Sequence, residues 1–559
     1  MVFALNTFRG FSLKVGFFSV FAIISTLTFA QNNFWQNSQV HGNVQADVMY
    51  YLKDSAIGAP DVPEKLLMNG FTNIVYSNGG FSMGVRYENY MNALLGFDPR
   101  YKGNGITYRY ASFTKDNFDI TAGNFYEQFG NGLIFRSYEE RNLGFDNAMD
   151  GLRVKYTPVK GLTIKGIYGY QRKYFDKGEG IVRGADLDVS LNEVFKKWES
   201  AKTRMVIGGS IISKYEDDKD PVYKLPKNVA AFAGRGNIIF GGFNIGAEYA
   251  YKINDPSAAN HRIYKPGEAL LIQASYSRKG LGILLAAKRV DNMDFRSERD
   301  ATGNALLINF LPPLTKQHIY SLPAMYPYAT QANGEIGLQG QVVYTFKKKS
   351  KLGGKYGTTV TLNYARANSI VKQQVDDATP IDSSGTLGYT SPFWKMGKET
   401  YFEDANLEIS HKFTKLFKAS LTYAYLTYNV DVIEGHAEGM VYAHAAILDM
   451  TFALNTKHAL RTEIQYLYTK QDEHEWLMGL LEYTIAPKWF VAAMDMWNYG
   501  NPDADMRIHY YNFAAGFIHG SSRIALSYGK QREGILCVGG VCRQVPAANG
   551  ITLTLTTSF

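Results

Sequence analysis

Two cysteines near the end of the chain have a spacing that predicts a disulfide. Cys537 and Cys542 flank Val-Gly-Gly-Val, and the two glycines allow a tight reversal that would bring the sulfurs together. A bond of this kind persists outside the reducing cytosol. No histidine or acid lies between the two thiols, so the segment does not favour a metal site. We expect a small disulfide loop and no bound metal.

One acid–histidine cluster could in principle carry acid–base chemistry. It consists of Asp472, Glu473, His474 and Glu475. The simpler interpretation is a solvated charged turn, because surface acid clusters usually serve solubility. The chain has no His-Glu-x-x-His zinc motif, no Gly-x-Ser-x-Gly elbow and no Walker phosphate loop, and its ten histidines lack ligand spacing. We therefore expect no enzyme, no catalytic residue and no cofactor.

A loop rich in charges and glycine occupies residues 127–149. Its charged members are Arg136, Glu139, Glu140, Arg141 and Asp146. Mixed charges suit a segment that folds into a barrel and is tied to the wall by ion pairs, where it would set a polar constriction. The alternative is a solvated surface loop.

A second long joint, residues 291–334, is too apolar to be a free loop. We expect it to pack against the barrel interior or against a partner protein. Its candidate packing or partner-binding residues are Phe310, Pro312, Pro313, Tyr326 and Tyr328. Arg296 and Arg299 in the same joint are further candidates for the constriction.

The elements that must position these loops are β-strands. Every even residue of the segment 40–52 is apolar or small while most odd residues are polar, and the pattern recurs in 243–253, 336–346, 401–413 and 460–468. Such a ribbon has one apolar face and one polar face. The 39 Tyr, 34 Phe and 6 Trp also suit strands at a membrane–water boundary. We count about 24 candidate strands, most of them as long as the ~9–11 residues that cross a bilayer.

The joints between these strands alternate between short and long. Short turns occur for example at 77–80, 159–161 and 520–521, and the long joints include 53–67, 90–104, 368–400 and 532–548. Tight turns on one rim and long loops on the other are typical of an up-and-down outer-membrane barrel. A soluble sandwich would instead have to cover its apolar faces with other segments of the chain.

The two ends of the sequence predict export and barrel insertion. Arg9 and Lys14 precede an apolar run and a Thr-Phe-Ala site, so residues 1–30 form a predicted signal peptide and residues 31–559 the mature barrel. The first amphipathic strand begins near Val40, and we expect no plug domain before it. The last strand, 551–559, alternates and ends on Phe559, which resembles the signal by which outer-membrane barrels are recognised for insertion.

Charge and location limit the partners. The formal net charge of +8 is modest, and the basic residues are scattered, so nucleic-acid binding gains little support. We expect a protein of the cell outer membrane whose partners are outer-membrane lipid, the barrel-assembly machinery during insertion, and other envelope proteins in the case that it acts in a complex.

Several strings resemble a Bacteroidota outer-membrane barrel family catalogued as a domain of unknown function. They are residues 123–136, 138–141, 291–293, 309–313, 325–330 and 537–543. The resemblance extends from about residue 40 to Phe559. It implies an outer-membrane location and a barrel fold, and it implies no activity.

Two functions from different classes follow. The first is a porin-like channel for small solutes, with inward loops that place Arg136, Glu139, Glu140 and Arg141 at the narrowing. The second is a non-conducting accessory subunit of a secretion or barrel-assembly complex, in which the stretch 306–328 and the disulfide loop bind partners. An enzyme ranks third.

Overall fold

The computed structural model describes residues 37–538 and 541–559. The predicted signal peptide, residues 1–30, and the predicted mature start at Gln31 lie outside the described residues. The two glycines between the cysteines, Gly539 and Gly540, lie outside them as well. The first described strand begins at Ser38.

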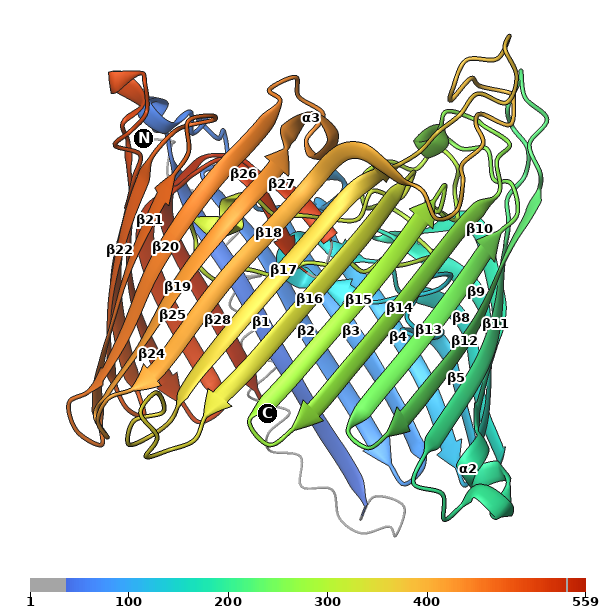
Figure 1. The fold of residues 1–559 in the computed structure, drawn as a ribbon, viewed down its shortest axis with the longest axis horizontal. Helices are drawn as coiled ribbons and strands as arrows, with labels where there is room; N and C mark the ends of the chain where they lie inside the picture. Colours follow the sequence, from blue (N-terminus) through green and yellow to red (C-terminus); the bar gives the residue numbers. More distant parts are fainter. Residues whose placement is uncertain (1–36, 539–540) are drawn as a thin grey trace, which may run out of the picture.

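The described residues form a closed sheet of 24 antiparallel strands (Figure 1). The ring closes where β1 (Ser38–Leu52) pairs with β28 (Ala548–Ser558). At this seam the backbone N–H of Phe559 donates to the carbonyl of Gly42, and the N–H of Gly42 donates to the carbonyl of Phe559, both at 3.0 Å. A closed ring has no edge strand left to pair with another chain. The predicted transmembrane-type antiparallel β-barrel is therefore confirmed.

The other wall strands follow one another around the ring in chain order. They are β2 (Leu66–Asn78), β3 (Phe81–Asn92), β4 (Gly103–Lys115), β5 (Phe118–Phe125), β8 (Met149–Val159), β9 (Leu162–Lys173), β10 (Asp176–Ser190), β11 (Arg204–Tyr215), β12 (Asn228–Phe240), β13 (Phe243–Lys252), β14 (Gly267–Arg278), β15 (Leu281–Asp291), β16 (Glu335–Phe346), β17 (Thr358–Ile370), β18 (Met396–Lys412), β19 (Phe417–Asn429), β20 (Met440–Ala453), β21 (His458–Tyr468), β22 (Trp476–Ile485), β23 (Trp489–Trp497), β24 (His509–His519) and β25 (Ser522–Gln531). Two short hairpins pair apart from the wall: β6 (Glu139–Glu140) with β7 (Phe145–Asp146), and β26 (Gly534–Val538) with β27 (Val541–Val545).

Between residues 37 and 538 and from 541 onward, helical structure is confined to single turns in the joints. The α-helical turns are α2 (Leu191–Val194) and α3 (Val430–Ile433). The 3-10 turns are Ser55–Ile57, Pro99–Tyr101, Arg141–Leu143, Lys196–Trp198, Ala258–Asn260, Pro323–Met325 and Ala504–Met506. No helix within the described part of the chain is long and apolar enough to cross a membrane.

The two rims differ as the sequence predicts. Short turns such as 79–80, 160–161 and 520–521 join strands on the lower rim of Figure 1, and the long joints lie on the upper rim. The lower rim has two longer joints, 191–203 with α2 and 347–357. The upper rim has one very short joint, Tyr174-Phe175 between β9 and β10, which the sequence analysis did not single out.

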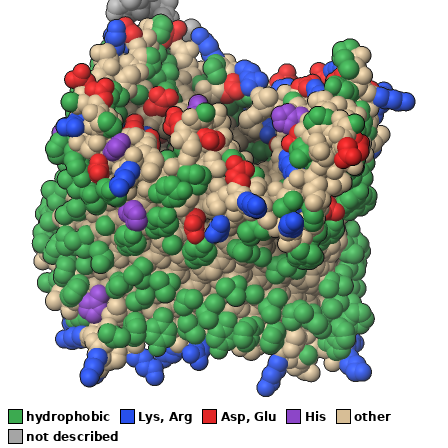
Figure 2. Space-filling view, turned by 45° about the horizontal axis from the view of Figure 1, so that its top comes forward, with side chains coloured by type: hydrophobic (Ala, Val, Ile, Leu, Met, Phe, Trp, Pro, Cys, Tyr) green, Lys and Arg blue, Asp and Glu red, His purple; other side chains and the backbone are tan. Residues whose placement is uncertain are grey.

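The outer face of the wall is apolar and uncovered. In β1 the even residues face outward, with Val40 59% and Tyr50 43% exposed, while Tyr51 faces inward and is 5% exposed. Leu285 of β15 and Phe513 of β24 are likewise 57% and 54% exposed. Figure 2 shows such side chains as a hydrophobic band across the visible face of the wall, with Lys and Arg below it. An apolar surface of this extent is stable only against lipid or another apolar partner, so the chain is a β-barrel of the outer-membrane type.

A row of glycines marks a corner of the wall. Gly123 of β5, Gly151 of β8 and Gly169 of β9 are register partners across three neighbouring strands. Glycine in a strand interior often marks a bend or a close approach of two backbones. A Cβ atom at Gly151 would collide with the carbonyl oxygen of Tyr168. The backbones therefore approach too closely here for any side chain.

The corner and the early end of β5 bring two distant strands together. β4, β5 and β8 separate β3 from β9 in the wall, and strands about 4.8 Å apart would place β3 and β9 about 19 Å apart in a flat sheet. The chain leaves the wall after Phe125, and above this point Arg172 of β9 reaches Glu88 of β3, with an Nη2–Oε2 distance of 2.6 Å.

We expect Gly151→Ala to lower the free energy of unfolding by about 1–3 kcal/mol, because the new methyl group forces the β8 and β9 backbones apart. Denaturant unfolding of the purified barrel in detergent, followed by tryptophan fluorescence, measures the change. The matched control is Gly234→Ala in β12, where a Cβ atom would meet nothing within 4 Å. Equal stability of the two variants would contradict the close approach at the corner.

Candidate functional site

Three long joints of the upper rim turn into the barrel and fill much of its interior (Figure 1). We call residues 126–148, between β5 and β8, the first loop. Residues 292–334, between β15 and β16, are the second loop. Residues 532–547, between β25 and β28, are the hairpin loop and contain β26 and β27. The lumen that these loops leave open is the candidate functional site.

The first loop has an apolar side that packs on the inner wall. Phe129, Leu133, Ile134 and Phe135 are fully buried, and they form one core with inward wall residues and with the second loop. The wall contributes Ile167, Val182, Ile212, Val229, Ala231, Ala233, Ala250, Ala269, Leu271, Ala286 and Val290 to this core. The short apolar run Leu-Ile-Phe at 133–135 is the sequence signal for this packing. The charges of the same segment, taken alone, suggest a polar loop.

The charged side of the first loop is joined to the wall by a buried ion network. Asp146 accepts from Arg86 of β3 at 2.7 Å and from Arg172 of β9 at 2.6 Å. Glu139 pairs with Arg86 at 2.5 Å, and Glu88 pairs with both arginines. The side chains of Arg86, Glu88, Arg172 and Asp146 are at most 6% exposed. Buried charges of this kind are stable only when every one of them is paired.

A tyrosine at the root of the first loop completes the network. The hydroxyl of Tyr126 donates to Asp146 at 3.0 Å and accepts from Arg86 at 3.2 Å. Burial, with Asp146 close by, holds the pKa of Tyr126 well above its ordinary value. Tyr126 therefore stays protonated and keeps its hydrogen bond to Asp146 at any physiological pH.

The structure separates the predicted constriction residues into distinct environments. Arg141 pairs with Glu139 at 2.7 Å, and Glu140 is half-buried before the 3-10 turn that follows it. Arg136 lies apart from these acids, with its guanidinium 4.1 Å from the ring centres of both Tyr138 and Phe310. The first loop is thus tied to the wall by the ion pairs of Glu139 and Asp146, whereas Arg136 packs on aromatic rings.

The second loop is held at its two ends by buried charges of the wall. Lys288 and Glu335 are fully buried and pair at 3.0 Å, and the Lys288 ammonium also donates to the carbonyl of Pro312 at 2.7 Å. Arg296 pairs with its neighbour Asp294 at 2.8 Å, and Arg299 pairs with Glu216 at 3.2 Å. Arg296 and Arg299 therefore fix the loop to itself and to the joint after β11.

The middle of the second loop runs along the inner wall, where it contacts β18, two strands from β16, and the joint after β21. Lys316 reaches Glu408 of β18 at 3.2 Å, and His318 reaches Asp404 at 3.0 Å. Tyr326 donates to Asp472 at 3.0 Å. Tyr328 donates to Glu335 at 2.5 Å and stacks on Phe402. The stretch expected to pack on the barrel interior or on a partner thus packs on the interior.

The hairpin loop closes part of the barrel opening at the upper rim of Figure 1, which we call the outer mouth. Its predicted disulfide between Cys537 and Cys542 is present, and the two residues are register partners of β26 and β27. Val538 and Val541 pack on Leu143 and Phe145 of the first loop. Asn304 of the second loop donates to the carbonyl of Cys542 at 2.6 Å. The three loops therefore interlock.

The acid–histidine cluster serves the same packing. Asp472 accepts from Tyr326, and Glu473 pairs with Arg532 at 3.3 Å. Burial raises the pKa of Glu473, and the Arg532 charge opposes that rise. In the described part of the chain, no group of three or more His, Cys, Asp or Glu side chains could hold a metal ion.

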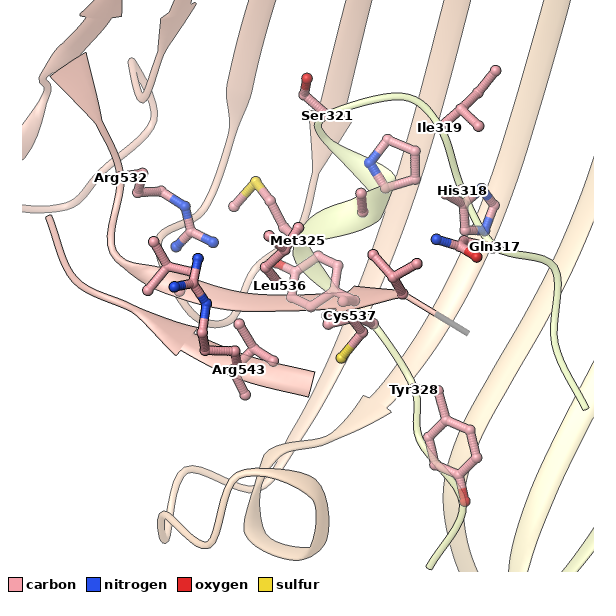
Figure 3. A pocket seen from close by; sticks show the side chains of 18 of the residues that line it. Gln317, His318, Ile319, Ser321, Met325, Tyr328, Arg532, Leu536, Cys537 and Arg543 are labelled. Atoms are coloured by element: carbon pink, nitrogen blue, oxygen red, sulfur yellow. The ribbon is translucent and has the colours of Figure 1, made fainter. Parts of the chain in front are cut away.

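A chamber of about 820 Å³ remains open between the second loop and the hairpin loop (Figure 3). Met494, Met496 and Asn512 of β23 and β24 form its wall side. Figure 3 shows Met325 and Leu536 close together near its middle, with Gln317, His318 and Ile319 at one end and Arg532 and Arg543 at the other. The chamber lining thus combines apolar surface with basic and amide groups. The sequence predicts five residues of this lining as candidates for packing, partner binding or the disulfide, namely Phe310, Pro313, Tyr326, Tyr328 and Cys537. It does not single out the basic residues.

Two smaller cavities flank the loops. One of about 510 Å³ lies at the outer mouth between the joint after β3, the first loop and the hairpin loop. Another of about 270 Å³ lies below Asn131 of the first loop and is lined by Arg235, Asn237 and Gln273 of the wall. Arg235 pairs there with Asp188 at 2.6 Å. The polar side chains of this cavity suit contact with water.

Comparisons with known proteins add a family and a fold. A family model described as a family of unknown function (DUF6029) matches residues 13–559. No curated protein matches the chain. The predicted resemblance to a family of unknown function is confirmed, and the Bacteroidota source stays a prediction.

The chain is also similar to solved barrel structures at low identity. The siderophore receptor PirA from Pseudomonas aeruginosa is 11% identical with a TM-score of 0.41, over 93% of this chain and 80% of that one. The P pilus usher (PapC) translocation pore is 9% identical with a TM-score of 0.42, over 93% and 99%. OccAB3 from Acinetobacter baumannii is 9% identical with a TM-score of 0.34, over 94% and 99%. These likenesses carry no information on function.

We expect Asp146→Asn to lower the free energy of unfolding by about 3 kcal/mol, because Arg86 and Arg172 would lose the carboxylate that they share in a buried site. The same variant should expose the first loop to added protease. Denaturant titration and limited proteolysis of the purified barrel measure both effects.

Asp98→Asn is the matched control for this prediction. Asp98 pairs with Arg100 at the outer mouth, where the arginine side chain is 59% exposed, so we expect a loss below about 1 kcal/mol. The Arg100 guanidinium, the Arg100 backbone N–H and the Tyr174 hydroxyl all donate to Asp98, and together they lower the pKa of Asp98 to about 2. If the two variants lost stability equally, the ion network would not be what fixes the first loop.

Proposed function

Because the chain belongs to the DUF6029 family, a family of unknown function, we propose a role argued from its own lumen: a channel that lets small solutes cross the outer membrane through the chamber. In this proposal the protein is exported to the outer membrane and stands there in lipid. The channel is selective, since the loops leave only a narrow route, and it carries out no chemical reaction on the solute.

The observation that carries the proposal is the chamber inside the lumen. Its volume of about 820 Å³ lies within the ~300–1,000 Å³ typical of small-molecule sites. A wall of 24 strands alone would enclose a much wider passage. The loops reduce this passage to the size of one small organic solute.

The way in which the loops are held also supports a fixed, narrow route. The Asp146 network fixes the first loop, and the Lys288–Glu335 pair fixes the second. Loops tied by buried ion pairs do not move aside at small cost, because separating a buried pair costs about 3–5 kcal/mol. A solute therefore passes between the loops, by way of the chamber.

The alternative role as an accessory subunit has less support. It requires the stretch 306–328 to be available to a partner protein. Tyr326 and Tyr328 are instead 4% exposed and bonded to groups of the same chain. Ile319 is 85% exposed, and it lines the chamber. These contacts favour the channel.

We expect the purified protein to conduct ions in planar lipid bilayers, and Ile319→Trp to reduce the single-channel current by about half or more. The larger ring would occupy the chamber without disturbing a packed core, because Ile319 is exposed in the lumen.

Val222→Trp is the control, since Val222 is 76% exposed in the joint 216–227 and does not line the chamber. It should leave the current unchanged. A folded wild-type barrel that never conducts would refute the channel. Equal currents in wild type and Ile319→Trp would move the route away from the chamber.

A further inference from the structure

Most of the basic side chains that line the chamber have an acidic partner, and one does not. Lys316 pairs with Glu408, His318 with Asp404 and Arg532 with Glu473. Arg543 of β27 has no carboxylate partner among the described residues. Its guanidinium instead lies 4.1 Å above the ring of Phe97.

The guanidinium of Arg543 also has unused donors. Its Nε and Nη1 atoms are buried, and neither meets an acceptor within residues 37–538 and 541–559. Burial lowers the pKa of Arg543, and the hydroxyl of Tyr51 opposes that lowering. A charge held without a carboxylate partner in a partly buried place is costly, which makes an anion in the adjoining cavities favourable.

The position of Arg543 places these donors on the proposed route. Arg543 lines both the chamber and the cavity of the outer mouth. Figure 3 shows the guanidinium groups of Arg532 and Arg543 directed toward one another at one end of the chamber. Two guanidinium groups on one anion are the arrangement that binds carboxylates through paired, charge-assisted hydrogen bonds.

The rest of the chamber has the opposite character. Leu536 is 43% exposed, and Ile535, Met325 and Pro313 line the same space. An inorganic anion would leave this apolar surface in contact with water. A solute with a hydrocarbon or aromatic body would cover it.

We propose that the chamber binds organic carboxylates with an apolar body, with Arg543 as the principal anchor of the carboxylate and Arg532 as the second. This inference rests on the proposed function and names the solute class of the same site. The apolar body lies against Leu536, Met325 and Ile319, and the carboxylate faces the outer mouth.

Titration calorimetry on the full-length barrel in detergent tests the proposal with three probes of one shape. They are 3-phenylpropanoate, 3-phenylpropylammonium and neutral 3-phenylpropan-1-ol. The carboxylate should bind about tenfold or more tightly than either of the others, because it alone satisfies the guanidinium donors. Raising the salt concentration should weaken its binding.

Arg543→Gln should weaken carboxylate binding about tenfold or more and leave the alcohol unaffected. Arg543→Lys should keep part of the preference, because it retains the charge and loses the planar fork. The matched control is Arg100→Gln. Arg100 also lies over an aromatic ring, 4.4 Å from that of Tyr174, but it pairs with Asp98 and does not line the chamber. It should change the affinity less than twofold.

The outcomes separate this inference from the channel itself. Equal binding of the three probes, or equal loss in Arg543→Gln and Arg100→Gln, would overturn the carboxylate site even if the barrel conducts. Carboxylate binding that depends on Arg543 in a barrel without conductance would uphold the site and refute the channel. Retention of the folded, heat-modifiable band on gels shows that each variant has its barrel.

Discussion

The constraint on which the rest of the structure depends is the width of the barrel. Closure of 24 strands pairs the backbone hydrogen-bonding groups of every strand and directs the apolar faces outward. It also leaves an interior too wide for wall side chains to fill. The upper joints provide the missing volume. The first loop, the second loop and the hairpin loop enter the lumen, and the size of the passage is set by how they pack and no longer by the number of strands.

Ion pairs are a physically sensible way to hold such loops. The inner wall of a barrel alternates with the lipid-facing side and is largely polar, so a loop cannot rely on a continuous hydrophobic surface for its attachment. Asp146 joins β3 and β9 to the first loop, and Lys288 with Glu335 joins the root of the second loop to β15 and β16. A buried pair is weak evidence for added stability, but its strict geometry selects one arrangement of the loop over others.

The sequence predicts the wall well because wall and lipid impose a period of two. The alternation from Val40 to Leu52, the unequal joints and the disulfide between Cys537 and Cys542 all follow from local rules, and the structure confirms them. The sequence does not predict which residues pair with the loop charges. Arg86 and Asp146 are 60 residues apart and meet only because the wall turns a corner. Arg543 looked like any other basic residue of a loop, because the absence of a partner is a property of three dimensions.

The two halves of the lumen are filled by different means, and this difference explains where the chamber lies. Along β12 to β15 the inner wall carries alanines, which leave room for Phe129, Phe135 and Phe295 of the loops. Along β19 to β24 the wall itself carries large side chains such as Tyr428 and Trp476, and only a short part of the second loop, around Leu322 and Tyr326, packs on them. Side chains of the wall are too short to meet across so wide a lumen. The space between these side chains and the second loop therefore stays open. The chamber is therefore a consequence of where the chain places its bulk, and the unpaired Arg543 lies where that open space meets the outer mouth.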